Sequence, residues 1–565
     1  MPTVLLRSVM VSLALALAAG GALATAVEPG HCAGSGLPTG RYFDKRHYVP
    51  APLPQYADLK GRLPAPIYDD EPLWVATYWQ AWQLAFRHFK EPAPGSGFVS
   101  QFIDAAFNQN IFLWDSSFMT MFTNVAAPLV PGISTLDNFY ARQHDDGEIA
   151  REIVRQTGED YGFWVNDACG PLISRLGWRD FSWDALQGRG WPVTYQGRAI
   201  PTPNPILTLD ALDNPVLAWA ELESYRYTGE RARLEQVWEP LLRYYEALQT
   251  YLLQGNGLYM TDWASMDNSA RNPYLQGGGT AIDTSSQMAL FARNLAEMAR
   301  ILAKPDMARR FDTEADELAR HINRQMWDSE RHFYFDLTLQ GARAPVKTIA
   351  AYWSLIGRVA SPAQAGSLVA ELGNPLTFGR PNAVPTLSAD EPQYNRGGGY
   401  WNGSVWAPAT TMIIRGLEAY GYDELARRVA LNHLRLVATV FQNTGTIWEN
   451  YSPEQAAPGN PAQQDFVGWS GIGPILYLLE YGVGLKPDAA HNELSWNLQA
   501  SGRTGCERYR FNGHVVALLA AAAHRNAAQR RLTIESDGMF SLRVTYRGRV
   551  ETFQVRKGRQ YFTVR

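Results

Sequence analysis

The clearest helix in this sequence is encoded by residues 305–327, PDMARRFDTEADELARHINRQMW. An α-helix completes a turn every 3.6 residues, so apolar residues spaced by three or four positions share one face. In this stretch the apolar residues follow steps of four, three, four and four positions: Phe311, Ala315, Leu318, Ile322 and Met326. The stretch therefore predicts an amphipathic helix whose apolar stripe packs against a neighbouring element.

Outward from this helix, twelve segments with helical character follow one another in six pairs. They lie near residues 72–90, 115–127, 132–143, 212–228, 230–254, 281–303, 305–327, 348–358, 361–373, 403–420, 422–441 and 468–484. Long loops rich in Gly, Pro and aromatic residues join them. Six helical hairpins over residues 72–488 predict a mainly α fold, an (α/α)6 toroid whose loops at one end form a cleft.

The two ends of the chain differ from this helical body. Residues 1–26 contain Arg7, an apolar run and then small residues, the pattern of a cleavable signal peptide. Residues 27–71 are rich in Pro, Gly and Tyr without a period, which predicts an extended arm. Short alternating segments separated by turn signals predict a small β-rich module at 489–565. We expect an exported protein, periplasmic or secreted.

Composition narrows the class of partner. The 565 residues include 51 Lys plus Arg and 55 Asp plus Glu, a near balance that argues against a nucleic-acid partner. Beyond the signal peptide, no apolar run is long enough to span a membrane. The chain has 18 Trp, and an indole face can stack on the apolar face of a sugar ring, which favours a carbohydrate partner. The sequence specifies no oligomeric state.

The cysteines leave two interpretations open. The chain has three of them, Cys32, Cys169 and Cys506, which permit at most one disulfide. In an oxidising compartment Cys169 could pair with either of the others. Three unpaired and mostly buried cysteines fit the sequence equally well.

Several common catalytic sites are missing from the sequence. No His pair has metal-ligand spacing, no Cys cluster exists and no dedicated calcium loop is present, so we predict no metal and no cofactor. The glycine runs at 277–279 and 397–399 lack a preceding strand, and Gly468-Trp469-Ser470-Gly471 lacks the last glycine of a nucleophile elbow. What remains is carboxylates among aromatic residues. Glycoside hydrolysis uses such a pair of carboxyl groups.

Four loop segments stand out: 111–118, 262–271 and 446–454 combine carboxylates with tryptophan, and 400–408 carries two tryptophans beside Asn402. In these segments, and over about residues 75–485, the chain resembles the helical-barrel glycosidases of glycoside hydrolase family 63. The resemblance is to the mannosylglycerate-hydrolase-like branch in particular, with trehalases as close relatives. It implies an (α/α)6 fold, inversion at an α-linked anomeric centre and no obligatory organic cofactor. The implied substrate is a gluco- or manno-configured oligosaccharide or small glycoside, cleaved from the chain end.

The same resemblance assigns the two catalytic carboxyls. Met266-Asp267-Asn268-Ser269 is similar to the loop that holds the family's general acid, and Trp448-Glu449-Asn450-Tyr451 to the segment that holds its general base. An aromatic, partly dry pocket would raise the pKa of Asp267, as a general acid requires. Alternatively, Asp267 is part of an ordinary turn, Glu449 is a solvated loop residue and Glu454 is the base.

The chain departs from the family pattern beside the sugar subsites. Ala270 stands where a proline is frequent, Ser265 where glycine is frequent, and Asn402 where the mannosylglycerate branch commonly has arginine and trehalases have asparagine. The sugar, the linkage and the aglycone are therefore not predicted.

Around the two carboxyls we predict sugar-contacting residues that are aromatic, polar or, at one position, small. They are Trp114, Asp115, Gln143, Asp146, Arg151, Trp401, Asn402, Gly403, Trp406, Trp448, Asp465 and Trp469. Structural roles compete at several of these positions. Asp115 could cap a helix, a turn could explain Asp146, and one or two tryptophans could belong to the core.

Other functions fit parts of the same sequence. A periplasmic trehalase is the nearest alternative enzyme. A polysaccharide lyase on a helical toroid would need Tyr, His and Arg near an acidic sugar, and a glycoside phosphorylase would need only the acid. A non-catalytic sugar-binding protein would need neither Asp267 nor Glu449, and both are present.

Overall fold

The computed structural model describes most of the predicted body and C-terminal module. The described residues are 47–108, 110–144, 147–158, 215–261, 266–275, 279–523 and 529–565, with the short strands β6 (Thr194–Tyr195) and β7 (Arg198–Ala199). The predicted signal peptide, Cys32, Asp146 and Cys169 lie outside the described residues.

Helices form the body of the molecule, and each of the twelve predicted segments contains helix within the described residues. The main helices are α3 (Pro72–Ala85), α4 (Leu113–Thr123), α5 (Thr135–Ala141), α7 (Leu217–Thr228), α8 (Arg231–Leu252), α10 (Ile282–Ile301), α11 (Pro305–Gln325), α12 (Trp353–Ile356), α13 (Pro362–Gly373), α14 (Ala407–Ala419), α15 (Asp423–Thr444) and the π-helix η8 (Ile472–Val483). The segment predicted near 348–358 is shorter than expected, a 3-10 turn η5 (Ile349–Tyr352) followed by α12.

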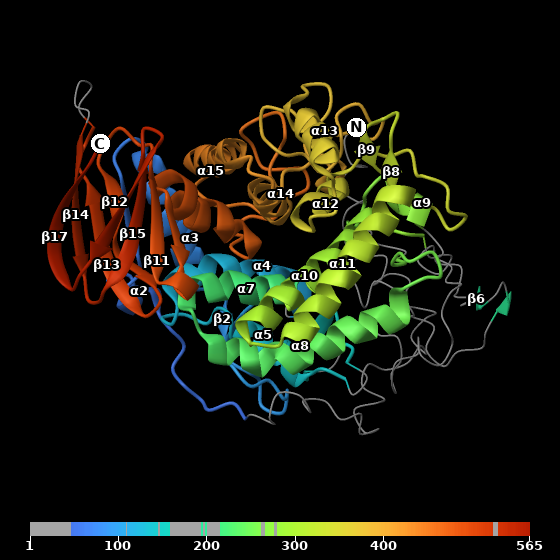
Figure 1. Cartoon of the computed structure of the whole chain (residues 1–565), viewed down its shortest axis with the longest axis horizontal. Helices are drawn as coiled ribbons and strands as arrows, with labels where there is room; N and C mark the ends of the chain where they lie inside the picture. The colour runs from blue at the N-terminus through green and yellow to red at the C-terminus, as the bar shows by residue number, and fades with distance from the viewer. Residues whose placement is uncertain are drawn as a thin grey trace, which may run out of the picture.

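Six of these elements contact one another in a closed circuit. Helix α4 contacts α7, α7 contacts α10, α10 contacts α12, α12 contacts α14, α14 contacts η8, and η8 returns to α4. The other long helices pack onto this circuit, for example α11 on α10 and α15 on α14. Both pairs lie side by side in the cartoon (Figure 1).

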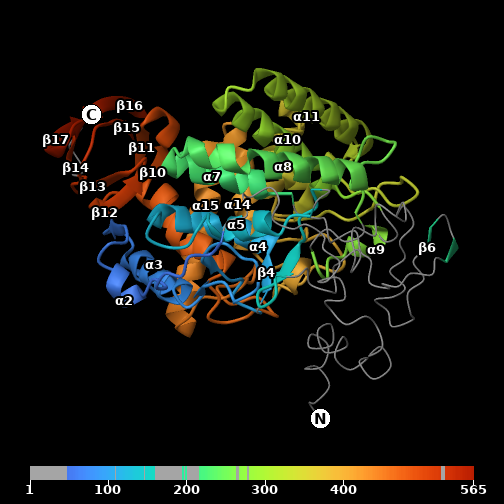
Figure 2. The same cartoon turned by 90° about the horizontal axis from the view of Figure 1, so that it is seen from below.

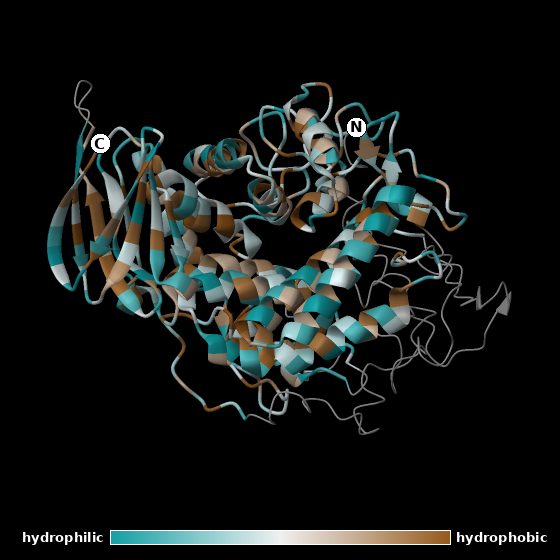
Figure 3. Cartoon of the chain, in the orientation of Figure 1, coloured by the Kyte–Doolittle hydropathy of each residue, from teal (hydrophilic) through white to brown (hydrophobic). Residues whose placement is uncertain are grey.

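Burial patterns distinguish the circuit from the helices that cover it. In α11 the predicted stripe is buried, including Phe311, Ala315, Leu318 and Ile322. The remaining surface of α11 carries charged side chains, which appear as hydrophilic colour along this helix (Figure 3). In α10 and α14, by contrast, buried residues occur on all faces. A helix with one apolar stripe suits an outer position, and a helix buried all round requires neighbours on every side.

The C-terminal region forms two sheets at one end of the helical body in both views (Figure 1, Figure 2). The five-stranded sheet has the order β1-β12-β13-β14-β17 and the four-stranded sheet the order β10-β11-β15-β16. Their bounds are β1 (Ala65–Tyr68), β10 (Leu485–Asp488), β11 (Glu493–Leu498), β12 (Thr504–Phe511), β13 (His514–Ala520), β14 (Arg530–Ser536), β15 (Phe540–Tyr546), β16 (Arg549–Val555) and β17 (Gly558–Val564).

Strand β1 joins the predicted N-terminal arm to this C-terminal sheet. Ala65 pairs with Glu507 and Tyr68 with Thr504 in an antiparallel register. Strands β1, β10, β11 and β12 also contact η8, so the sheets pack directly on the helical circuit. Cys506 lies buried in β12.

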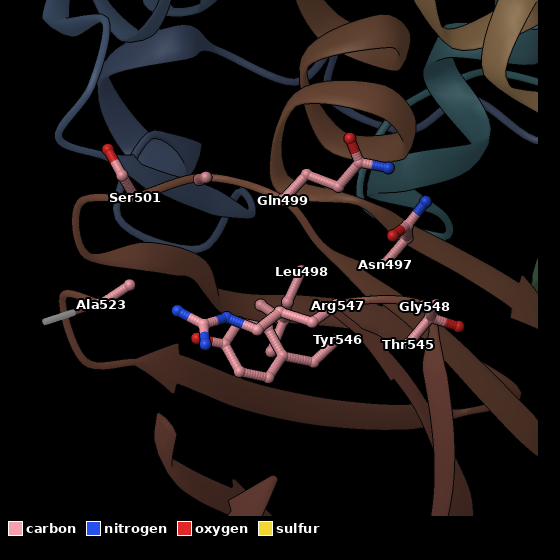
Figure 4. Close-up of a pocket in the computed structure, with 10 residues that line it drawn as sticks. Asn497, Leu498, Gln499, Ser501, Ala523, Thr545, Tyr546, Arg547 and Gly548 are labelled. Atoms are coloured by element: carbon pink, nitrogen blue, oxygen red, sulfur yellow. The ribbon is translucent and has the colours of Figure 1, made fainter. Parts of the chain in front are cut away.

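A hollow of about 470 Å³ opens at the ends of β11 and β15 and is lined by Asn497, Leu498, Gln499, Ala500, Ser501, Ala523, Thr545, Tyr546, Arg547 and Gly548. In this hollow the guanidinium of Arg547 lies 5.4 Å from the ring centre of Tyr546 (Figure 4). None of the predicted sugar-contacting residues lines it.

Short two-stranded ribbons complete the described fold. They are β2 (Phe89–Lys90) with β3 (Phe102–Ile103), β4 (Asn110–Phe112) with β5 (Glu152–Val154), β6 with β7, and β8 (Trp327–Asp328) with β9 (Phe333–Tyr334). No helix in the described part of the chain combines the length and the apolar character needed to cross a bilayer.

Candidate active site

Asp267 lies close enough to two other carboxyl groups and one phenol, all from distant segments, to influence their ionisation. Burial raises the pKa values of Asp115, Glu449 and Tyr400, and the negative charge of Asp267 raises each of them further. The charge of Arg151 opposes these effects by lowering the pKa values of Asp115 and Asp267. The structure thus brings four of the predicted site residues and Tyr400 into one electrostatic neighbourhood.

Glu449 lies buried with both carboxylate oxygens engaged. The Tyr400 hydroxyl donates to Oε1 at 3.1 Å, and the backbone N–H of Gln463 donates to Oε2 at 3.1 Å. Hydrogen bonds to a carboxylate favour its charged form. Burial nevertheless dominates and raises the pKa of Glu449 to about 7. Its protonation state therefore changes close to neutral pH.

The backbone of Glu449 is also fixed. Its carbonyl oxygen accepts hydrogen bonds from the Trp469 indole N–H and from the Ser470 hydroxyl, both at 3.1 Å. Trp469 and Ser470 lie in the 3-10 helix η7 (Trp469–Gly471), directly before η8. A loop carboxylate is thereby attached to a rigid helix of the circuit.

Asp267 lies on the turn before the short helix α9 (Asn272–Leu275). Its side chain is exposed to solvent, yet desolvation by the surrounding protein raises its pKa. The turn is anchored by Arg271, whose side chain is fully buried. The Arg271 guanidinium binds both carboxylate oxygens of Asp283, at 2.8 and 2.6 Å, and Asp336 at 3.0 Å.

Asp115 occupies the first turn of α4 and is buried. It is not the N-cap of that helix, because Phe112 holds the N-cap position. Among the described residues its Oδ1 has no hydrogen-bond partner. Burial raises the pKa of Asp115 well above its usual range, although a backbone hydrogen bond and the charge of Arg151 act in the opposite direction.

Tryptophans form a continuous aromatic cluster beside these carboxyls. Trp401 stacks on Trp406 with ring centres 4.5 Å apart and an angle of 5°, and Trp406 contacts Trp469 at 5.6 Å. All three of these indoles are buried. Trp114 and Trp448 are half-buried, so part of each indole remains accessible to a ligand.

The other predicted residues occupy different surroundings. The Gln143 amide is buried and donates to the carbonyl oxygens of Gly147 and Pro240 at 2.9 and 2.8 Å, while its Oε1 has no partner among the described residues. The Asp465 carboxylate is exposed; it accepts from the Thr446 hydroxyl and lies 4.0 Å from Arg87.

Gly403 and Asn402 are neighbours in the 400–408 segment, and both affect the backbone conformation around the site. Gly403 has a φ of 149°, and a Cβ atom there would lie 2.7 Å from the carbonyl oxygen of Asn395. A side chain at this position would therefore displace the backbone. The Asn402 amide is hydrogen-bonded to the backbone of the Asp267 turn at Asn268 and Ala270.

The rival base Glu454 is held in a different way. Its carboxylate binds the Arg380 guanidinium at 2.8 and 2.9 Å and accepts from the Tyr394 hydroxyl at 2.8 Å. The hydrogen bonds from Arg380 lower the pKa of Glu454. A carboxylate that is paired with an arginine is a poor proton acceptor, so the environment of Glu454 suits a structural role.

Sequence reasoning assigned no role to Tyr400, Arg271 or Gln463. Tyr400 and Arg271 both stand inside segments that carry the family resemblance, but their partners Glu449, Asp283 and Asp336 lie outside the same segments. The Gln463 contact is made by a backbone N–H, which leaves no signature in residue type. Within the described residues, no group of three or more His, Cys, Asp or Glu side chains is arranged to hold a metal ion.

Comparison with known proteins identifies the family of the chain. The sequence model of the mannosylglycerate hydrolase MGH1-like glycoside hydrolase domain matches residues 143–470, more than half of the chain. A mannosylglycerate hydrolase from Rubrobacter radiotolerans is 35% identical over 150 residues, which cover 26% of this chain and 33% of that protein. A protein from Borreliella burgdorferi is 27% identical over 313 residues, covering 52% of this chain and 65% of its own length. The chain thus spans less than two thirds of each of these relatives.

Among solved structures, the GH63 mannosylglycerate hydrolase from Thermus thermophilus, in complex with glucose, is similar in fold. The TM-score is 0.51 at 18% identity, and the match covers 70% of this chain and 98% of that chain. At this identity the likeness concerns the fold.

Proposed function

This chain belongs to the mannosylglycerate hydrolase MGH1-like family of glycoside hydrolases, and from that premise we propose that it is an exported, inverting α-glycoside hydrolase acting on chain ends. The proposed substrates are α-linked gluco- or manno-configured oligosaccharides or small glycosides. The closed circuit of six helices, with the other long helices packed on it, supports an (α/α)6 toroid as the scaffold.

The observation that carries the proposal is the position of Asp267 near buried Glu449, close enough for its charge to raise the pKa of Glu449. Inverting hydrolysis needs two carboxyls about 6.5–9.5 Å apart, one protonating the leaving oxygen while the other takes a proton from water on the opposite ring face. A second carboxyl close enough to raise the pKa of Glu449 supports a pair of this kind.

In the proposed reaction, Asp267 donates its proton to the glycosidic oxygen as the bond to the anomeric carbon breaks. Glu449 accepts a proton from a water molecule whose oxygen forms the new bond to that carbon. The proton lost by Asp267 and the proton gained by Glu449 balance, and exchange with solvent restores both groups. The aglycone leaves as an alcohol, and the sugar carries the inverted configuration.

The positions of the two groups agree with these roles. The exposed Asp267 carboxyl is accessible to a substrate oxygen, while the desolvated surroundings raise its pKa and so favour the protonated form. The Glu449 carboxylate is held by Tyr400 and Gln463, which leaves it one orientation in which to activate water. Half-buried Trp114 and Trp448 are the proposed stacking surfaces for the sugar.

Product analysis tests the proposal. The mature protein is incubated with α-linked gluco- and manno-oligosaccharides, trehalose and mannosylglycerate, and proton NMR follows the anomer released first. We expect the β-anomer, lost in Asp267→Asn and Glu449→Gln and retained in the matched control Glu454→Gln. Initial release of the α-anomer would overturn the assignment of Glu449 as a base acting on water. Cleavage of trehalose alone would select the trehalase alternative.

Export is tested separately. Expression of the full chain in a Gram-negative host, followed by fractionation and N-terminal sequencing, should recover a periplasmic or secreted protein. Cleavage should follow one of the two small-x-small motifs, Ala22-Leu23-Ala24 or Ala24-Thr25-Ala26. Retention of an uncleaved chain in the cytoplasm would contradict the proposed localisation.

A further inference from the structure

Two asparagines connect the turn that holds Asp267 to the loop that holds Trp401. The Asn268 side chain accepts from the backbone N–H of Trp401 at 2.9 Å and donates to the carbonyl oxygen of Gly399 at 3.1 Å. In the opposite direction, the Asn402 side chain accepts from the backbone N–H of Ala270 at 3.0 Å and donates to the carbonyl oxygen of Asn268 at 2.8 Å. The four hydrogen bonds form one reciprocal connection, the Asn268–Asn402 clamp.

The clamp uses the particular chemistry of a side-chain amide. An amide presents one carbonyl acceptor and one NH2 donor, so it can pair with a backbone N–H and a backbone C=O at once. The 399–403 loop needs such partners because its backbone is irregular: Gly399, Tyr400 and Gly403 all have positive φ angles. In the described part of the chain, the backbone N–H and C=O groups of this loop have no neighbouring strand to bond to. The Asn268 side chain from the opposite loop bonds to one of each instead.

The clamp is concentrated around the general acid. Two of its four bonds reach the backbone at Asn268 and Ala270, one and three residues after Asp267. A third amide, that of Asn272, donates to the carbonyl oxygens of Met266 and Asp267 at 2.8 and 3.2 Å. The backbone on both sides of Asp267 is therefore held by side-chain amides, while the Asp267 carboxyl itself points to solvent-accessible space.

Neutral amides also suit the electrostatics of a general acid. A lysine or arginine at position 268 or 402 would lower the pKa of a neighbouring carboxyl and favour its charged form. Among the described residues, Arg151 is the one cation whose charge is found to lower the Asp267 pKa. The clamp thus holds the turn without adding a second positive charge.

We propose that Asn268 and Asn402 are positioning residues, which fix the Asp267 turn on the Trp401 loop so that the acid meets the glycosidic oxygen. Asn402 then serves the reaction through the turn rather than by binding sugar. This inference rests on the proposed role of Asp267 as general acid.

The first test compares two leaving groups. An alkyl or glycerate aglycone needs protonation as it departs, whereas fluoride departs without it. Asn402→Ala and Asn268→Ala should lower kcat for the natural α-glycoside about 10- to 100-fold, because small misplacement of a catalytic group has effects of this size. Turnover of the α-glycosyl fluoride of the same sugar, and KM for both substrates, should change less than about threefold.

The outcomes separate this inference from the proposed function. Asp267→Asn should show the same selective loss; equal loss on both substrates in that variant would overturn the acid assignment itself. If Asp267→Asn is selective but Asn402→Ala loses both substrates equally with a raised KM, Asn402 binds sugar and the clamp has no positioning role. Asn497→Ala, an exposed asparagine in β11, is the matched control and should leave both rates unchanged.

The second test needs no substrate. Hydrogen–deuterium exchange measures protection of the two loops, since the amide hydrogens of Ala270 and Trp401 are both donated into the clamp. In Asn402→Ala, exchange at Ala270 should accelerate at least about tenfold, and in Asn268→Ala the same should hold at Trp401. Unchanged exchange in both variants, with Asn497→Ala as reference, would overturn the clamp irrespective of any activity.

Discussion

The hydroxyl of Tyr400 donates a 3.1 Å hydrogen bond to Oε1 of Glu449. Tyr400 belongs to the loop bonded to the Asp267 turn, and Glu449 belongs to the segment attached to η7. The phenol therefore links the proposed acid side of the site to the proposed base. Its backbone φ of 63° lies in a region that a bulky residue seldom occupies, which indicates that the surroundings impose this placement.

Tyr400→Phe should shift the acidic limb of the pH–activity profile upward. The hydrogen bond stabilises the charged form of Glu449, so its removal raises a pKa that burial already holds at about 7. A base must be deprotonated to act, and the variant should therefore lose more activity at pH 6 than at pH 8. The profile of kcat/KM against pH measures this shift, and an unmoved limb would show that Tyr400 does not act on Glu449.

Glu449→Gln should abolish activity and yet stabilise the protein at alkaline pH. Because the folded-state pKa of about 7 exceeds the unfolded value, the stability tied to this proton is present below about pH 4.5 and is lost as the pH rises through 7. At pH 8 the wild type carries a buried charge that the variant lacks, and we expect the variant to be more stable by about 1–3 kcal/mol.

Urea unfolding at pH 8 and pH 4 measures the Glu449 effect, which should disappear at the lower pH. The comparison variant is Glu454→Gln. Its carboxylate has a lowered pKa and an arginine partner, so the sign reverses and the variant should be less stable than wild type at pH 8. If both variants changed stability in the same direction at pH 8, burial would not be what raises the pKa of Glu449.

Arg271→Met should strongly destabilise the fold. The substitution leaves the buried carboxylates of Asp283 and Asp336 without their cation, and breaking a buried ion pair costs about 3–5 kcal/mol. Denaturant unfolding quantifies the loss. Arg309→Met removes an exposed ion pair with Asp306 and should change stability by less than about 0.5 kcal/mol. Comparable effects in the two variants would contradict the anchoring role of Arg271.

His433→Phe should make the protein more resistant to acid. His433 is fully buried between Tyr451 and Tyr477, and neither ring nitrogen has a partner among the described residues. Burial lowers its pKa to about 3, so the stability linked to the neutral ring is complete above about pH 6.5 and is lost as the pH falls.

As the pH falls from 6.5 to 4.5, the free energy of unfolding of the wild type should decrease by about 2–3 kcal/mol more than that of His433→Phe. Thermal or urea unfolding across that range shows the difference as a slope. Parallel slopes for the two proteins would show that His433 is not held neutral in the fold.

Local sequence patterns account for the secondary structure. The stripe of Phe311, Ala315, Leu318 and Ile322 is buried in α11 as its spacing requires, and alternation in β14 gives alternating burial. These features depend on residues a few positions apart, because helix and strand periodicities are short. Two segments differ from their local pattern. The 3-10 turn before the shortened helix α12 packs against α10 and α14, and the predicted extended arm contains the short helix α2 (Tyr56–Leu59) and the strand β1, which pairs with β12.

The candidate site likewise has one part that the sequence indicates and another part that only the tertiary structure creates. Residue types alone indicated carboxylates among tryptophans, and the family resemblance of those segments assigned the acid to Asp267 and the base to Glu449. The roles of Tyr400, Arg271 and the Asn268–Asn402 clamp depend instead on which distant segments meet. Tyr400 and Glu449 are 49 positions apart, and Asn268 and Asn402 are 134 apart. Burial and hydrogen bonding across such separations arise when the helices pack, and no pattern within a single segment encodes them.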